Sequence, residues 1–161
     1  MDAVQSLVLL SSSPRHTENI GAALYKYLKR GGVLALFGDL ATGKTCLVRG
    51  IAEDCKISDP VHSPTFTLVN QYGTPPVLYH LDLYRVSSPD DLQELGIEEI
   101  FDGEILCVVE WAERAPGLLP ERRVDIQLSH TGGDNRQLEI TNYGLMSADW
   151  LADFKEKFMI A

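Results

Sequence analysis

The stretch Val33–Leu47, VLALFGDLATGKTCL, decides the fold. It begins with an apolar run typical of a buried strand, continues into Gly38-x4-Gly43-Lys44-Thr45, and ends in a segment with helical apolar spacing. In such a phosphate-binding loop the glycines turn backbone N–H groups towards phosphate oxygens, the Lys reaches the outer phosphates and the Thr hydroxyl serves magnesium. The sequence therefore predicts a nucleoside triphosphate site. Its candidate residues are Gly38, Asp39, Leu40, Ala41, Thr42, Gly43, Lys44, Thr45 and Cys46.

Length and composition bound the rest of the prediction. A chain of 161 residues buries about 68–70% of its unfolded surface, so we expect one domain over residues 1–161. Residues 1–10 have only a four-residue apolar run, preceded by Asp2, and match neither a signal peptide nor a membrane span. The three cysteines lack paired spacing, which argues against a disulfide framework or a zinc knuckle. These features predict a cytoplasmic protein with no membrane partner.

Charge is distributed unevenly along the chain. The net charge is −9; residues 1–60 hold seven Lys/Arg and six Asp/Glu, whereas residues 61–161 hold seven and seventeen. Seven acidic residues without a base fall within residues 90–104. This stretch is either a solvated helix face or a docking patch for a basic partner. Phosphate attraction needs clustered Lys/Arg, so we expect nucleic acid to be reached only through a partner.

Strand-like and helix-like segments alternate, which predicts a layered α/β domain with a mixed, mainly parallel central sheet flanked by helices in three layers. Turn signals at 73–76 and 131–135 predict two hairpins. The expected strands are 4–10, 33–37, 67–72, 77–84, 105–110, 124–129 and 137–141. The expected helices are 17–29, 44–55, a short one within 89–101, and 148–158.

A second half of the site is expected at Glu110. The apolar run 105–109 reads as a strand buried on both faces, and Glu110 stands at its carboxyl end, where ligands bind in open α/β sheets. A P-loop needs an acidic partner that steers magnesium. Glu110 is therefore the candidate metal residue beside Thr45, the alternative being an exposed strand terminus.

The segment His80–Arg85, HLDLYR, is another polar constellation. Strand alternation puts His80, Asp82 and Tyr84 on one face. Asp82 could accept a hydrogen bond from a nucleophilic water or hold a metal-bound water, with His80 as its orienting neighbour. A structural hydrogen-bond network is the alternative.

The segment Ser63-Pro64-Thr65 lies between the P-loop helix and the next strand. The proline restricts the backbone on both sides, and the hydroxyls could close over a terminal phosphate as a nucleotide-sensing switch. An ordinary Ser-Pro turn is the alternative.

Together, GDLATGKT, SPTFTLV, YHLDLYR, DLQELGIEEIF and VVEW, in this order, resemble the bacterial TsaE family, also called YjeE. The resemblance covers roughly residues 17–126. It implies a P-loop NTPase fold and an ATPase required for threonylcarbamoyladenosine modification of tRNA. The implied partners are a threonylcarbamoyl transferase subunit (TsaD-like) and its paralogue (TsaB-like), which carry out the chemistry on tRNA while ATP hydrolysis resets or activates them.

The resemblance also implies residue roles. Lys44, Asp82 and Glu110 fall on the family's catalytic positions, and Thr45 with Glu110 would hold Mg2+. Thr65 matches the family's switch-like Ser-Pro-Thr, and Thr17 falls where the family places a Thr near the adenine. No arginine finger is evident in the sequence, so we expect weak ATP hydrolysis by the protein alone.

Two positions depart from the family pattern. Ala41-Thr42 stands where the family usually has Gly-Ala, and at a positive φ an Ala costs about 1 kcal/mol or more relative to Gly. Ala112 replaces a common Pro after the Glu-Trp pair, which predicts a less rigid loop.

Other functions remain open at this point. A small-molecule or nucleoside kinase would use the same loop with an Asp as base, although the sequence has no Arg-rich lid segment. A nucleotide-dependent scaffold would need ATP binding, with hydrolysis only incidental. A GTPase is disfavoured because the Asn-Lys-x-Asp and Asp-x-x-Gly motifs are absent from the sequence.

Overall fold

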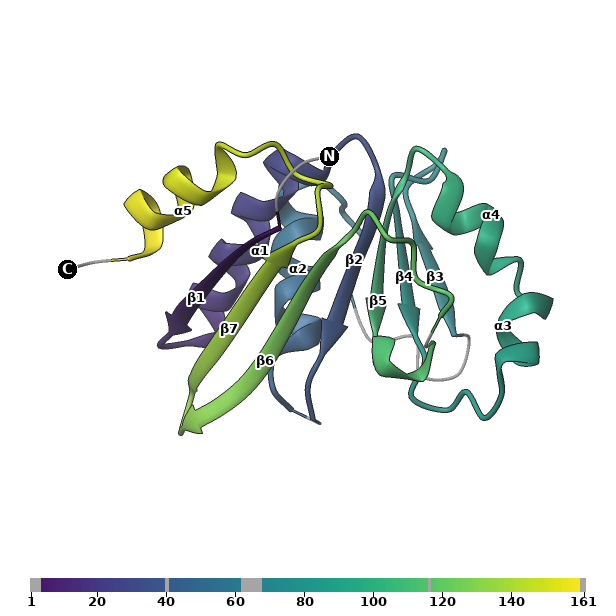
Figure 1. The fold of residues 1–161 in the computed structure, drawn as a ribbon, viewed down its shortest axis with the longest axis horizontal. Coiled ribbons are helices and arrows are strands. Elements are labelled where there is room, and N and C mark those ends of the chain that lie inside the picture. Colours follow the sequence, from purple (N-terminus) through teal and green to yellow (C-terminus); the bar gives the residue numbers. More distant parts are fainter. Residues whose placement is uncertain (1–3, 40, 62–67, 116, 160–161) are drawn as a thin grey trace.

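The computed structural model describes residues 4–39, 41–61, 68–115 and 117–159. Seven strands form one sheet in the order β1-β7-β6-β2-β5-β4-β3, which Figure 1 shows from β1 at the left to β3 at the right. The strands are β1 Gln5–Ser11, β2 Gly32–Phe37, β3 Val69–Tyr72, β4 Leu78–Asp82, β5 Leu106–Glu110, β6 Val124–Gly132 and β7 Asn135–Asn142. The helices are α1 Pro14–Leu28, α2 Lys44–Asp54, α3 Pro89–Glu94, α4 Ile97–Asp102, the 3-10 turn η1 Ala112–Arg114, and α5 Trp150–Phe158.

The sheet is mixed, as the sequence predicts. Strands β6, β2, β5 and β4 are adjacent and parallel. Antiparallel strands extend this centre on both sides: β7 pairs with β6 and β1 with β7, and β3 pairs with β4 at the other edge. The two predicted hairpins are therefore confirmed as the β3–β4 and β6–β7 connections.

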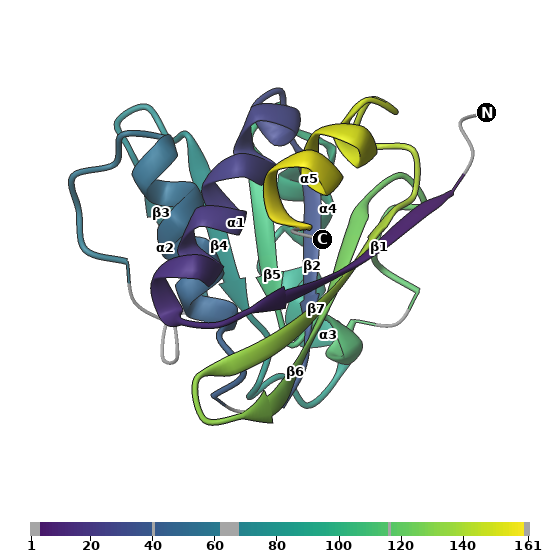
Figure 2. The same ribbon diagram turned by 90° about the vertical axis from the view of Figure 1, so that its left-hand side faces the viewer.

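Helices cover both faces of the central strands, which confirms the three-layer prediction. On β2, Leu34 and Leu36 pack into a core shared with α1, α2 and α5. The alternate residues Val33 and Ala35 pack into a second core with α3 and α4. Figure 2 shows α1 and α5 on one side of the sheet. Burial on both faces explains why β2 and β5 read as continuous apolar runs.

Two predicted helices differ from the observed ones. The predicted helix over 17–29 begins earlier, because Ser13 caps the N-terminus by accepting a hydrogen bond from the His16 N–H, with Pro14 in the first turn. The predicted helix within 89–101 is two short helices, because Gly96 takes a left-handed conformation with φ of 68° between α3 and α4.

The topology gathers the predicted site at one edge of the sheet. Because β2, β5 and β4 are parallel neighbours, the P-loop after β2, Glu110 at the end of β5 and Asp82 at the end of β4 meet at their carboxyl ends. Within the described part of the chain, no helix has the length and apolar character needed to cross a bilayer.

Candidate nucleotide-binding site

The P-loop backbone requires glycine at both ends. Gly38 has a φ of 144°, and a Cβ there would lie 2.6 Å from the Leu128 carbonyl oxygen and 2.9 Å from Thr42 Oγ1. Gly43 has a φ of 102° and forms the N-cap of α2 without a side-chain cap. The first N–H groups of α2 therefore have no side-chain cap, as is typical of a helix N-terminus that receives an anion.

The middle of the loop is strained. Ala41 has a φ of 61°, so the cost expected for an Ala at a positive φ applies at this position. For an L-residue with a Cβ, this region costs about 1–2 kcal/mol. The neighbouring Thr42 is buried, and its hydroxyl donates to the Asp39 carbonyl at 2.9 Å. The loop thus holds one residue in a conformation that its own side chain disfavours.

Lys44 folds back onto its own loop. Its ammonium group donates to the carbonyl oxygens of Gly38 and Asp39 and lies 3.7 Å from the centroid of the Trp111 ring. The side chain is buried, at 5% exposure, and this desolvation lowers the pKa of Lys44. Neutral carbonyls and an aromatic face are weaker partners for an ammonium group than phosphate oxygens. Lys44 is therefore positioned to exchange these contacts for those of an anionic ligand.

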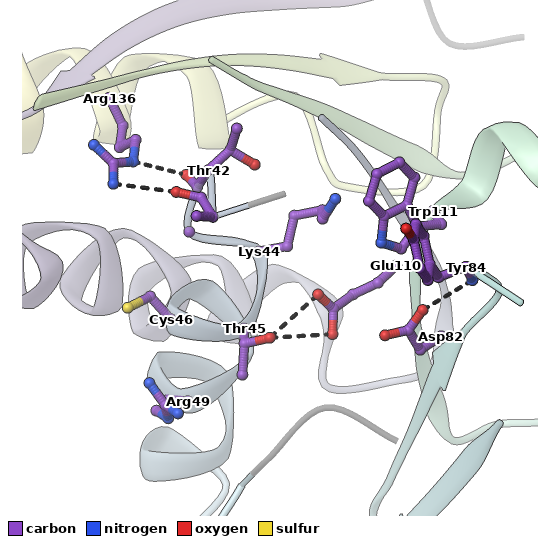
Figure 3. Close-up of a pocket in the computed structure, with 12 residues that line it drawn as sticks. Thr42, Lys44, Thr45, Cys46, Arg49, Asp82, Tyr84, Glu110, Trp111 and Arg136 are labelled. Carbon is purple, nitrogen blue, oxygen red and sulfur yellow. Dashed lines mark hydrogen bonds between the residues drawn. The ribbon is translucent and has the colours of Figure 1, made fainter. Parts of the chain in front are cut away.

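Thr45 and Glu110 face one another across the loop. The Thr45 hydroxyl lies 3.2 Å and 3.4 Å from the two carboxylate oxygens of Glu110 (Figure 3). A hydroxyl and a carboxylate at the end of a P-loop form the oxygen-donor set that suits Mg2+. These two residues could therefore hold a divalent cation, as the sequence predicts.

His80 supports Glu110 from behind. The imidazole Nε2 lies 2.5 Å from Glu110 Oε2, and both side chains are buried. The sequence suggests His80 as the neighbour that orients Asp82, whereas in the structure its Nε2 bonds to Glu110. Within the described ranges, His80 Nδ1 is a buried nitrogen without a hydrogen-bond partner.

Asp82 is the register partner of Glu110 on the adjacent parallel strand. Its Oδ1 accepts a hydrogen bond from the Tyr84 N–H at 2.9 Å, which fixes the carboxylate at the end of β4. The Tyr84 ring in turn packs against Trp111, with ring centroids 4.9 Å apart. Two carboxylates and two aromatic rings thus form one wall of the site.

These groups surround a cleft of about 480 Å³. Its lining residues are Ala41, Thr42, Gly43, Lys44, Thr45, Cys46, Arg49, Asp82, Tyr84, Glu110, Trp111 and Arg136 (Figure 3). Gly38 and Asp39 line an adjoining hollow on the β6 side of the loop. The structure thus brings together most of the predicted site residues.

Three predicted site residues need separate mention. Thr17 is buried in α1, and its hydroxyl pairs with Ser11 Oγ at 2.7 Å. Its methyl group would contact a Cβ at Gly43, so Thr17 packs behind the P-loop. Leu40 and Thr65 lie outside the described residues, as does the whole predicted switch segment 62–67.

Arg136 is a further residue of the site, one that the sequence did not predict. This residue stands at the start of β7, and its guanidinium donates to the carbonyl oxygens of Ala41 and Thr42. No local motif marks it, because its partners lie 95 and 94 positions earlier in the chain.

The fold and the site define the class of protein, which is a P-loop NTPase fold with a nucleotide site. The sheet is mixed and flanked by helices, and a glycine loop with a buried Lys follows one of its strands. A hydroxyl of this loop faces a carboxylate on the next strand. A family profile described as "Threonylcarbamoyl adenosine biosynthesis protein TsaE" matches residues 11–138. The chain belongs to this TsaE family.

Individual relatives agree with this assignment. The chain is similar to the tRNA threonylcarbamoyladenosine biosynthesis protein TsaE of Bacillus subtilis, with 40% identity over 82% of this chain and 83% of the relative. It is 39% identical to the protein of the same name from Treponema pallidum over 81% and 97% of the two chains. Among solved structures, Bacillus subtilis YdiB superposes with a TM-score of 0.79 and 31% identity, covering 98% of this chain and 99% of that one.

Proposed function

We propose that this chain is a single ATPase domain that binds ATP with Mg2+, hydrolyses it slowly, and supports threonylcarbamoyladenosine modification of tRNA. Family membership supports the pathway, since the relatives carry that function in their names. The main support for the proposed ATPase activity is the contact between the Thr45 hydroxyl and the Glu110 carboxylate, beside the buried Lys44. Mg2+ bound there would neutralise phosphate charge and orient the phosphoryl group that is transferred to water.

The side chains divide the work. Lys44 would bind the outer phosphates, because its ammonium group is already desolvated and donates to two backbone carbonyls beside the Trp111 ring. Gly43, Thr45 and the following amides of α2 contribute N–H donors at a helix N-terminus. We propose that Asp82 holds the attacking water, since its carboxylate lies in the same cleft wall as Glu110 and its orientation is fixed by the Tyr84 N–H.

The proposal includes partners and a compartment. The threonylcarbamoyl transfer itself needs a separate catalyst, for which we propose the TsaD-like subunit and its TsaB-like paralogue, with tRNA contacted only through them. The net charge of −9 supports an indirect role on tRNA. Cys46, Cys55 and Cys107 are free thiols, which fits a reducing compartment, and we propose the cytoplasm.

We also propose roles for Thr65 and Thr17, which the family resemblance implies. Thr65 would sense the terminal phosphate, and Thr17 would support the nucleotide site from behind the P-loop by packing against Gly43. The buried position of Thr17 and the bond to Ser11 favour this indirect role over a direct hydrogen bond to adenine.

The test is ATP turnover by the purified protein, measured alone and with the transferase pair and tRNA. We expect slow, Mg2+-dependent hydrolysis that rises when the partners are added. A parallel reaction with labelled ATP and candidate nucleosides addresses the kinase alternative, because a phosphorylated nucleoside would overturn the ATPase proposal.

A further inference from the structure

Arg136 ties the β6–β7 hairpin to the P-loop. Its Nε donates to the Thr42 carbonyl at 3.1 Å and one terminal nitrogen donates to the Ala41 carbonyl at 3.2 Å. The other terminal nitrogen donates to the carbonyls of Gly133 and Asn135, both at 2.9 Å, within its own hairpin. Figure 3 shows the guanidinium lying against the outer side of the loop.

The donor count points to a structural use of this side chain. A guanidinium has five N–H donors, and backbone carbonyls accept four hydrogen bonds from Arg136. Most of its hydrogen-bonding capacity is therefore directed to the loop and the hairpin instead of to a ligand.

The two loop carbonyls belong to the strained part of the P-loop. Ala41 has a φ of 61°, which a residue with a Cβ adopts only when its surroundings hold it there. In a trans peptide, the C=O of one residue and the N–H of the next point in opposite directions. With the carbonyls of Ala41 and Thr42 bound to Arg136, the N–H groups of Thr42 and Gly43 point away from it. Figure 3 shows Lys44 and Glu110 on that other side of the loop.

We infer that Arg136 is a positioning residue for nucleotide binding: it holds Ala41 in the left-handed conformation and so directs the Thr42 and Gly43 N–H groups towards the phosphates. The inference rests on the proposed nucleotide site. Arg136, which is 95 positions from Ala41 in the sequence, sets the geometry of the loop. The ligand is the polyphosphate of a nucleotide, read by backbone N–H groups.

The test is a double-mutant cycle between Arg136→Gln and Ala41→Gly, with ADP titrated by calorimetry. Arg136→Gln in the parent background is expected to weaken ADP binding about five- to thirtyfold, because the strain at Ala41 then opposes the bound loop conformation. In the Ala41→Gly background the same substitution is expected to cost less than about threefold, since glycine adopts a positive φ without that strain. Equal losses in the two backgrounds would overturn the inference.

Two further variants separate geometry from charge. Arg136→Lys keeps the positive charge but lacks the planar fork that reaches two carbonyls, so we expect a loss close to that of Arg136→Gln. Parent-like affinity of Arg136→Lys would show a charge contact with phosphate and overturn the positioning role. Arg122→Gln is the matched control, because Arg122 donates to the Gly144 carbonyl, outside the cleft, and its loss is expected to leave ADP affinity unchanged.

Hydrogen exchange of the nucleotide-free protein gives an independent measurement. The amides of residues 41–45 are expected to exchange faster in Arg136→Gln than in the parent, whereas those of β5 are unchanged. If the parent binds neither ATP nor ADP, the proposed function fails, and the exchange data still decide whether Arg136 holds the loop. Unchanged exchange in the loop would overturn the inference.

Discussion

His80 and Glu110 form the most buried polar contact of the site, with 2.5 Å between Nε2 and Oε2 and exposures of 0% and 3% for the two residues. Glu110 therefore has a donor on each side: the imidazole behind it and the Thr45 hydroxyl in front. An ionised carboxylate is costly to bury unless hydrogen bonds satisfy it. This relationship keeps the Glu110 side chain directed towards the P-loop.

Removing the imidazole should therefore destabilise the fold. His80→Leu is expected to lower the free energy of unfolding by about 1.5–3 kcal/mol, the usual contribution of a hydrogen bond to a charged group. His80→Gln keeps an N–H donor and should recover part of the loss. Urea denaturation measures both variants. In a Glu110→Gln background, the effect of His80→Leu should shrink, and an undiminished effect would show that the imidazole acts only by packing.

Glu110→Gln should separate metal service from nucleotide binding. The amide keeps the shape of the side chain but removes the charge that attracts a divalent cation, so Mg2+-dependent hydrolysis should fall about a hundredfold while ADP affinity changes little. The measurement is ATP turnover across a Mg2+ titration, beside an ADP titration without metal. Thr45→Ser is the matched control because it retains the hydroxyl. Identical Mg2+ dependence in Glu110→Gln and the parent would remove Glu110 from the metal site.

The thiol of Cys46 should report nucleotide occupancy, with Cys55 and Cys107 as internal references. Cys46 lines the cleft, whereas burial raises the pKa of Cys55 and of Cys107. Because the thiolate is the reactive form, iodoacetamide at pH 8 should modify Cys46 first and Cys107 last. ATP at ten times its dissociation constant should slow the Cys46 reaction about tenfold. Peptide mass spectrometry measures each site, and modification of Cys46 at the same rate with and without ATP would contradict the cleft assignment.

The sequence predicted those parts of the site that depend on local patterns. The spacing from Gly38 to Thr45 predicts the loop, because Gly38, Gly43 and the Lys-Thr pair all fall within eight consecutive residues between a strand and a helix. Glu110 followed from a strand that is apolar on both faces and ends in an acid. Ser13-Pro14 also carried a helix-start signal, and the prediction of 17–29 overlooked it.

The contacts of His80 and Arg136 depend on tertiary structure that the sequence pattern does not contain. Alternation places His80 and Asp82 on one strand face, but only the β4–β5 register, which pairs Asp82 with Glu110, brings His80 diagonally across to that carboxylate. Arg136 reaches the P-loop because the β6–β7 hairpin extends past the end of β2. In both cases the side chain was visible in the sequence and its partner was not.

A variant of Asp82 can distinguish whether tRNA modification needs ATP hydrolysis or only ATP binding. Asp82→Ala is expected to retain nucleotide affinity within about threefold, because Asp82 lies on β4 and the phosphate contacts come from the P-loop. It should abolish hydrolysis, since the carboxylate proposed to hold the attacking water is gone. A switch that binds but cannot be reset should then fail after the first round of modification.

The measurement is threonylcarbamoyladenosine formed over several turnovers in a reconstituted reaction, beside an ADP titration of the same variant. Asp59→Ala, an exposed Asp outside the cleft, is the matched control and should behave like the parent. If Asp82→Ala binds ATP and does not hydrolyse it, yet supports normal multiple-turnover modification, ATP binding alone suffices. The protein would then act as a nucleotide-dependent scaffold, and Asp82 would serve the geometry of the cleft wall through its bond to the Tyr84 N–H.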